Sequence, residues 1–210
     1  MRGTMNWVNI LLLISSVVLI IVVAFVSKRH GRLQDAKNRR FLEEEQAANM
    51  ARKQEIEPEL FFQADLENLP HVPEDDPHKV LRTSRRTMIR FEVPESNVDL
   101  KKRYGVSQLE SITLYEENFH DFLKSLGEWA QALHKEGNTE CALQVLEYAI
   151  ELGSEFRGTY KLAADIYAHE RDAYALEQLM QMAQNNYFKD PAMQKHVLSY
   201  IEERITGLQV

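Results

Sequence analysis

The residues best suited to chemistry in this sequence are two acid–histidine pairs at helical spacing. Glu117 and His120 form an E-x-x-H, and Asp165 and His169 stand four positions apart, so each pair would share one helical face. An E-x-x-H binds metal in di-iron bundles, but such a site needs the motif twice together with two further glutamates. The sequence has no second copy of the motif and no evident third ligand for Asp165 and His169. Two surface pairs without a metal are therefore the favoured interpretation.

Motifs for nucleophilic catalysis and for phosphate binding are missing as well. The sequence contains no Walker loop, no nucleophile elbow and no H-E-x-x-H. Its single cysteine, Cys141, has no cationic neighbour in the sequence that would activate the thiol. One cysteine also excludes an internal disulfide framework and a multi-cysteine metal cluster. We therefore expect a protein that is not an enzyme and that binds no cofactor.

Length and charge narrow the remaining functions. The chain has 210 residues, which is enough for one or two domains, and a formal net charge of −7. An acidic chain is poorly suited to coating nucleic acid, because phosphate neutralisation by Lys and Arg supplies most of that affinity. Only 8 residues are glycine, so few are present for the tight turns of an all-β fold. This composition favours helices and a protein partner.

An uncharged apolar segment near the N-terminus predicts a membrane anchor. Residues 7–26 are 20 residues without a charge, and at 1.5 Å per helical residue they span about 30 Å, the thickness of the hydrocarbon core. The alternative is a cleaved signal peptide. It is less favoured because only Arg2 precedes the apolar run and no convincing small-x-small cleavage site follows it. We expect residues 1–27 to form the anchor.

The charges that flank this segment predict its orientation. Arg2 precedes it, whereas six cations follow it closely: Lys28, Arg29, Arg32, Lys37, Arg39 and Arg40. Lys and Arg are retained on the cytoplasmic side of a membrane. The expected localisation is the plasma (cytoplasmic) membrane, which the chain crosses once, with the N-terminus outside and the C-terminal domain in the cytoplasm.

The middle of the chain predicts two further regions. Residues 28–56 are rich in good helix formers and should form a charged juxtamembrane helix, with Arg39–Glu43 and Arg40–Glu44 as pairs of opposite charge. Residues 57–104 contain five of the six prolines, which predicts a flexible proline-rich linker. Residues 57–80 carry seven acids against Lys79, and residues 82–103 carry seven bases against three acids.

Two pieces of the expected linker could make contacts. Residues 60–69 mix acids with bulky apolar side chains and would dock either on a partner or on their own domain, the second being favoured. Residues 83–90 could form a basic docking arm or a phosphorylation target, although a charge run is more often a solvated face.

The C-terminal region, residues 105–210, has the periodicity of helices. Apolar residues recur every three or four positions over about 107–136, 139–152, 158–170, 175–184 and 191–205. A period of 34 residues is also present: Leu126, Trp129, Ala130 and Leu133 are followed 34 positions later by Tyr160, Ala163, Ala164 and Tyr167. Such a period indicates stacked helical hairpins, in which small residues mark close helix crossings. A generic helical bundle is the alternative.

This pattern resembles the tetratricopeptide repeat (TPR) family over roughly residues 123–186, with the helix at 191–206 as a cap. The second repeat departs from the family pattern, because its alanine, Ala175, comes one residue early and Met182 occupies a normally small position. The resemblance implies that the first helix of each hairpin lines a peptide-binding groove. It places these protein-binding candidates there: Lys124, Gln131, His134, Lys161, Asp165 and His169. Solvated side chains on ordinary helix faces are the alternative.

The overall expectation is an all-α protein with an N-terminal transmembrane helix, a charged juxtamembrane helix, a proline-rich linker and a C-terminal TPR-like α-hairpin domain. Its predicted function is that of a single-pass membrane-anchored scaffold or adaptor. The TPR-like domain would bind an unidentified protein or peptide partner and recruit it to the membrane. The alternative function is a membrane-bound regulator that contacts nucleic acid or anionic lipid through the basic residues 82–103.

Overall fold

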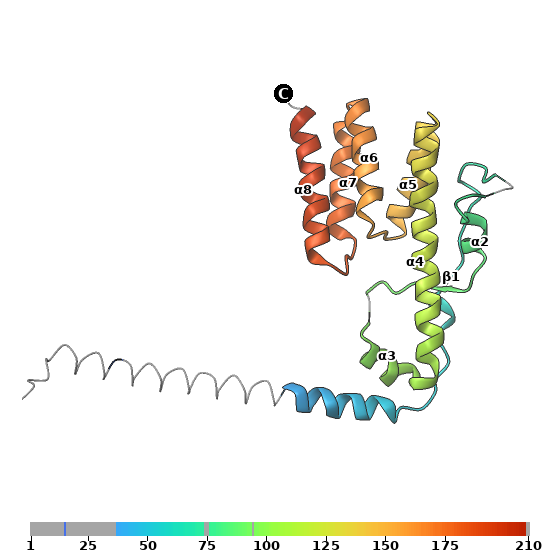
Figure 1. Cartoon of the computed structure of the whole chain (residues 1–210), viewed down its shortest axis with the longest axis vertical. Coiled ribbons are helices and arrows are strands. Elements are labelled where there is room, and N and C mark those ends of the chain that lie inside the picture. The colour runs from blue at the N-terminus through green and yellow to red at the C-terminus, as the bar shows by residue number, and fades with distance from the viewer. Residues whose placement is uncertain (1–14, 16–36, 74–75, 94, 209–210) are drawn as a thin grey trace, which may run out of the picture.

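The structure is a computed structural model that describes residues 15, 37–73, 76–93 and 95–208 (Figure 1). The membrane span expected at residues 7–26 lies outside the described residues, with the exception of Ser15. In the part of the chain that the structure describes, no helix combines the length and the apolar character needed to cross a bilayer.

The described chain is mostly helical, which confirms the all-α expectation. Residues 37–49 form the first described helix. The elements that follow are η1 (Pro58–Leu60), β1 (Phe61–Phe62), α2 (Val80–Ser84), β2 (Met88–Ile89), α3 (Asn97–Tyr104), α4 (Val106–Lys135), α5 (Thr139–Glu151), α6 (Arg157–Glu170), α7 (Ala173–Asn185) and α8 (Pro191–Leu208). The two-residue strands pair antiparallel, with Phe61 opposite Ile89 and Phe62 opposite Met88.

Helices α4 to α8 form successive hairpins, an arrangement compatible with helical repeats (Figure 1). Helices α4 and α5 end with the same hydrogen bond. Asn138 N–H donates to Leu133 O at 2.9 Å, and Ser154 N–H donates to Ala149 O at 2.9 Å. The carboxylate of Asp172 then caps α7 by accepting a hydrogen bond from Ala175 N–H at 2.9 Å. These local signals keep the turns short, so consecutive helices pack against each other.

The small residues of the 34-residue period lie fully inside this stack. Ala130 on α4 and Ala164 on α6 are both completely buried. A Cβ at Gly127 would lie 3.3 Å from Thr159 Oγ1, which shows how closely α4 and α6 approach. α8 packs on α6 and α7 with Val197 and Ile201 buried, so it closes the end of the stack as the sequence predicts.

The described residues of the expected linker differ from a flexible tether, because they pack on α4. Val72, Val80 and Met88 are buried in the same core as the repeat helices. The Phe62 ring lies 5.0 Å from the Phe119 ring, and residues 60–69 thus dock on their own chain. The interpretation from proline content failed because these elements are too short to show helical periodicity and are stabilised by tertiary contact. They cover the end of the stack opposite α8 (Figure 1).

A second, smaller core lies between β2, α3 and the N-terminal half of α4. Its buried members are Ile89, Leu100, Tyr104 and Ile112. Lys101 forms an ion pair with Glu45, and Gln54 N–H donates to Tyr104 O at 3.2 Å. The described part of the expected juxtamembrane helix is therefore bound to the rest of the molecule through α3.

Alkaline pH is expected to destabilise the stack through Tyr160. This side chain is fully buried, and burial raises the pKa of its hydroxyl to about 12. Because the folded pKa lies above the unfolded value of about 10, the contribution is present below pH 10 and is lost as the pH rises toward 12. The free energy of unfolding should fall by roughly 2–3 kcal/mol across that range. Urea unfolding between pH 8 and pH 12 would measure it.

The matched variant for this experiment is Tyr160→Phe, which keeps the ring and removes the titrating hydroxyl. It also removes the hydrogen bond in which Asn186 Nδ2 donates to Tyr160 Oη at 2.8 Å. Tyr104 retains a pKa of about 12 through burial and its bond to Glu57, so part of the pH dependence should remain. An unchanged slope in Tyr160→Phe would contradict the assignment.

Candidate functional site

The first helices of the hairpins lie side by side in one layer. α4 meets α6 where Gly127 approaches Thr159, and α6 meets α8 where the Lys161 Nζ lies 4.1 Å from the centre of the Tyr200 ring. The second layer contains α5 and α7, which Asn186 joins by donating to Ile150 O at 2.8 Å. The exposed side chains of the first layer are called the α4–α6–α8 face.

The three candidates on α4 differ in their surroundings. Lys124 is exposed, and its Nζ lies 4.0 Å from Glu128 Oε1. Gln131 is exposed beside α6, where a Cβ at Gly158 would lie 3.5 Å from its Nε2. His134 lies in the last turn of α4 and contacts the start of α5, because its Nδ1 lies 3.3 Å from Thr139 Oγ1. Lys124 and Gln131 are therefore available on the α4–α6–α8 face, whereas His134 contacts the turn.

Two of the three candidates on α6 are engaged by the closing helix. Asp165 Oδ1 accepts hydrogen bonds from Tyr200 Oη at 2.7 Å and from Arg204 Nε at 2.8 Å. Lys161 stacks on the same Tyr200 ring. The hydrogen bond to Asp165 raises the pKa of Arg204, while burial and that carboxylate raise the pKa of Tyr200. His169 is exposed in the last turn of α6.

Sequence reasoning missed Tyr200 and Arg204 because only the apolar face of the closing helix was considered. Their spacing of four residues places both on one helical face, a signal that was present in the sequence. The cluster they make with Lys161 and Asp165 leaves less of the α6 surface free than the resemblance implies. The open part of the α4–α6–α8 face is thus the junction of α4 with α6.

Two residues without side chains shape that junction. Gly127 on α4 and Gly158 on α6 both face the neighbouring helix, and Gly158 is exposed. Glycine allows another backbone to come close. Lys124, Glu128 and Gln131 stand beside the two glycines along α4 and offer one cation, one anion and one amide. This set suits hydrogen bonding to a polypeptide backbone more than proton transfer or metal binding.

The acid–histidine pairs do not form a metal centre in the described residues. No group of three or more His, Cys, Asp or Glu side chains in the described ranges could hold a metal ion. The His120 ring lies 4.6 Å from the Phe156 ring, and its Nε2 lies 3.8 Å from Glu155 Oε1. His120 therefore packs between α4 and the start of α6.

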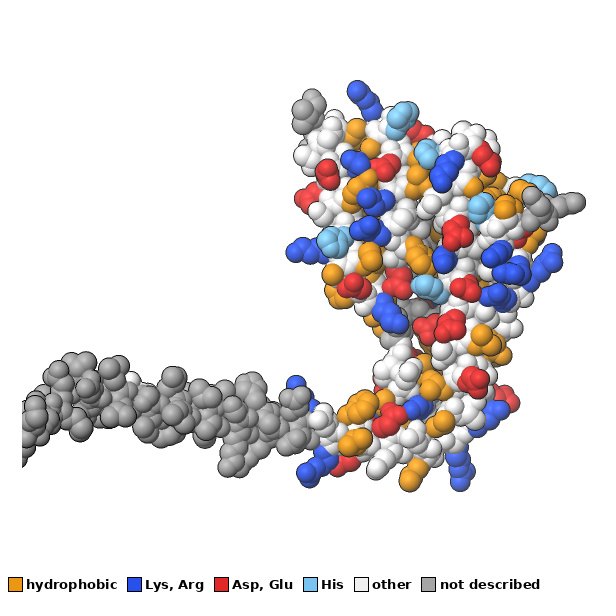
Figure 2. Space-filling view, in the orientation of Figure 1, with side chains coloured by type: hydrophobic (Ala, Val, Ile, Leu, Met, Phe, Trp, Pro, Cys, Tyr) orange, Lys and Arg blue, Asp and Glu red, His pale blue; other side chains and the backbone are white. Residues whose placement is uncertain are grey.

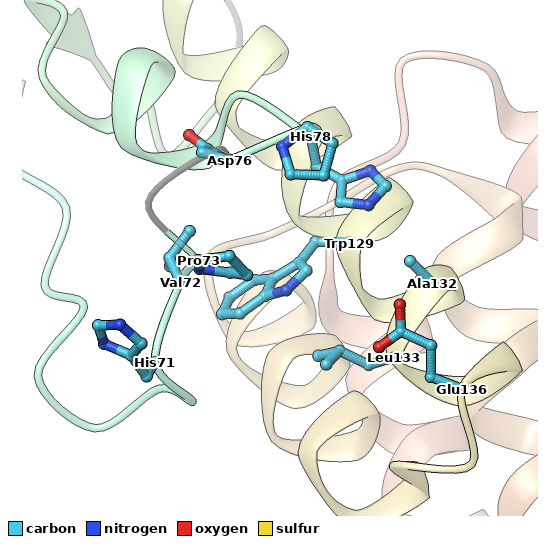
Figure 3. A pocket seen from close by; sticks show the side chains of 10 residues that line it. His71, Val72, Pro73, Asp76, His78, Trp129, Ala132, Leu133 and Glu136 are labelled. Atoms are coloured by element: carbon cyan, nitrogen blue, oxygen red, sulfur yellow. The ribbon is translucent and has the colours of Figure 1, made fainter.

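A small pocket lies beside the C-terminal half of α4, outside the α4–α6–α8 face (Figure 3). Trp129 forms its floor, and its volume is about 80 Å³. One wall comes from the chain before α2 and the other from the last turns of α4, and the lining residues are His71, Val72, Pro73, Asp76, Pro77, His78, Trp129, Ala132, Leu133 and Glu136. It is named the Trp129 pocket. Sequence analysis gave no sign of it, because its walls lie far apart in the chain.

The basic residues 82–103 do not form one arm. At α3 the cations are paired, since Arg103 bonds Glu95 at 2.6 Å and Glu57 at 3.1 Å. At α2 the exposed cations have no acid within ion-pair distance in the described residues; they are Lys79, Arg82 and Arg85. Basic side chains gather where α2 lies (Figure 2). Thr83 is buried and bonded to Ser125, so it is not an accessible phosphorylation target.

Comparisons with known proteins give no match for the chain. No protein-family model, no curated protein and no solved structure matches it. The resemblance to TPR proteins rests on the 34-residue period and on the helical hairpins themselves.

Proposed function

We propose that this protein is a membrane-anchored docking protein that binds a partner polypeptide on the α4–α6–α8 face. The observation that carries the proposal is the junction of α4 with α6. Gly158 there lies beside the exposed amide of Gln131, and Gly127 lies against the buried hydroxyl of Thr159, which has no hydrogen-bond partner in the described residues. A backbone laid along this junction could approach closely and exchange hydrogen bonds with Gln131.

A membrane anchor would hold the docking surface, and any partner bound to it, near the bilayer. The uncharged segment at residues 7–26 would insert in the plasma membrane, with the domain in the cytoplasm as the flanking cations favour. A partner held near the bilayer then meets other membrane components at high effective concentration, so a weak interaction is sufficient. The described ion pairs between the helix at 37–49 and α3 would hold the docking domain close to the anchor.

Site-directed photo-crosslinking in cells tests this function. A photoreactive amino acid at position 131 should crosslink to a specific protein in the membrane fraction, whereas the same probe at position 178 should not. Gln131 and Gln178 are both exposed glutamines, but Gln178 lies on α7 in the other layer. The captured protein should then bind Gln178→Arg as the wild type does and bind Gln131→Arg at least about tenfold more weakly. Equal crosslinking at both positions would refute the proposal.

A second candidate function is supported by the exposed cations at α2. Lys79, Arg82 and Arg85 would attract anionic lipid or another phosphate surface. Binding of the protein to vesicles with anionic lipid would then weaken steeply as salt rises, and Arg82→Ala with Arg85→Ala would remove it. Salt-independent binding, or binding that survives the double variant, would exclude this role.

A further inference from the structure

We propose that the first half of the helix at 37–49, residues 37–42, lies in the headgroup region of a lipid bilayer and forms a second membrane contact. This inference rests on the membrane anchor of the function proposed above. It adds a surface that is separate from the α4–α6–α8 face and from the cations at α2. The apolar and basic side chains that carry it are exposed in the structure.

The helix at 37–49 meets α3 through its second half. Glu45 pairs with Lys101, Glu44 pairs with Lys102, and Ala48 is fully buried. Residues 37–42 precede these contacts, and every one of them is exposed. The helix projects sideways from the base of α4, so its first half stands clear of the helical stack (Figure 1). This half therefore offers an open surface.

Two large apolar side chains lie on that surface. Phe41 is 57% exposed and Leu42 is 59% exposed. With 3.6 residues per turn they stand about 100° apart around the helix, so together they form one apolar side. Contact with water at both side chains is unfavourable, and transfer to an apolar phase would remove it.

Cations border this apolar side on both edges. Lys37 lies about 40° from Phe41 around the helix, and Arg39 lies about 60° beyond Leu42. Neither cation forms an ion pair in the described part of the chain. Glu43, an exposed acid, lies on the opposite side of the helix. An apolar side between basic residues is typical of a helix that lies in the membrane interface, because long basic side chains reach the phosphates.

The place of this helix in the chain favours lipid over another occupant. The uncharged segment at residues 7–26 ends eleven positions before Lys37. Eleven residues span at most about 40 Å, so the helix must begin near the surface of a membrane that this segment crosses. Three cations in the interval, Lys28, Arg29 and Arg32, strengthen the attraction to anionic headgroups.

Spin labels on the full chain test the proposal in vesicles of phosphatidylcholine and phosphatidylglycerol. The labels are attached to Leu42→Cys, Leu114→Cys or Val17→Cys in a Cys141→Ser background. Leu114 is the matched control, because it is a leucine on α4 that is 52% exposed. Oxygen, which concentrates in lipid, should relax the label at position 42 more than a water-soluble nickel complex does. The label at position 114 should show the reverse order.

The label at Val17, inside the uncharged segment, separates this inference from the anchor. Lipid exposure at position 17 with water exposure at position 42 would overturn the inference and leave the anchor intact. Water exposure at both positions would overturn both. Lipid exposure at position 42 alone would support the surface contact and contradict the anchor. A label at position 42 that is shielded from oxygen and nickel alike would indicate a protein partner or a second copy of the chain, and would also overturn the inference.

Charge reversal separates this surface from general attraction to anionic lipid. Lys37→Glu with Arg39→Glu should move the label at position 42 into water. Arg157→Glu with Lys195→Glu reverses two exposed cations of the stack and should leave that label in lipid. Equal effects of the two double variants would contradict the proposal. The unfolding midpoint of each variant should match that of the wild type.

Discussion

Replacing Gly105 by alanine should lower the free energy of unfolding by roughly 2–5 kcal/mol. It should also detach residues 52–57 from α3. Gly105 is the single residue between α3 and α4, and its φ is +80°, in the region that L-residues rarely adopt. A Cβ there would lie 3.1 Å from the carbonyl carbon and oxygen of Arg52 and from the Lys53 Cα. All three atoms belong to the backbone, so no side chain can rotate away.

In this variant, residues 52–57 should detach before the helices α4 to α8 unfold. Residues 52–57 are held against α3 by Gln54 N–H, which donates to Tyr104 O, and by Tyr104 Oη, which donates to Glu57 at 2.5 Å. The first of these contacts is made by the residue that directly follows Arg52 and Lys53, the two residues that the methyl group would meet. Limited proteolysis should therefore cut within residues 50–57 of the variant before it cuts within α4 to α8.

Two other glycines provide controls for the two causes. Gly153 has a φ of +88° and no described atom within 4 Å of an added Cβ, so Gly153→Ala measures the cost of the backbone conformation alone. Gly207, near the end of α8, has neither constraint, and Gly207→Ala should be neutral or slightly stabilising. Urea unfolding should rank Gly105→Ala below Gly153→Ala. Equal losses at these two positions would mean that the contact with Arg52 and Lys53 contributes nothing.

The helices of the stack could be predicted because the sequence signals that define each helix lie within that helix and its adjoining turns. Each has an apolar face repeated every three or four residues and ends at a turn signal such as Gly137 or Asp172. The small residues at the 34-residue period, Ala130 and Ala164, are both fully buried, as close helix crossings would require. α4 extends from Val106 to Lys135, close to the expected boundaries, because its capping signals are encoded within a few residues.

The segment at 57–93 could not be predicted in the same way. The apolar side chains that it adds to the core are isolated in the sequence. Val72, Val80 and Met88, which are buried, and Phe62, which is partly buried, are separated by prolines and charges, so no window of the sequence shows them as one surface. They become a surface only against α4. The apolar pairs at β1 and β2 were the available sign, since two exposed phenylalanines in a tether are costly.

The candidate site also combines features that the sequence predicts with features that depend on tertiary contacts. Helical spacing correctly placed Lys161 and Asp165 on one side of α6, but it could not show that Tyr200 and Arg204 of α8 would engage them. The Trp129 pocket depends on residues 71–73 and 76–78 lying beside the end of α4, more than fifty positions later in the chain. Sites of this kind require the tertiary structure.

Replacing Met88 by aspartate should lower the free energy of unfolding by about 4 kcal/mol and free residues 57–93 from α4. Met88 is 1% exposed on β2 and belongs to the same core as Phe122 and Leu126 of α4. A carboxylate at this depth would lose its hydration, and none of the buried polar side chains in the described ranges is a cation that could pair with it. The expected response is therefore that the segment detaches, which urea unfolding and proteolysis within 57–93 would record.

The control is Val93→Asp, which introduces the same charge five residues later in the same segment. Val93 is 68% exposed, so its replacement should change stability by no more than about 0.5 kcal/mol. A flexible tether would tolerate both substitutions equally, whereas a segment that completes the core tolerates only the second. Because Val72 in the same segment also lines the Trp129 pocket, Met88→Asp should at the same time disrupt that pocket and expose the Trp129 indole to solvent. A shift of tryptophan fluorescence to longer wavelength in Met88→Asp, and its absence in Val93→Asp, would connect the buried segment to the pocket in one measurement.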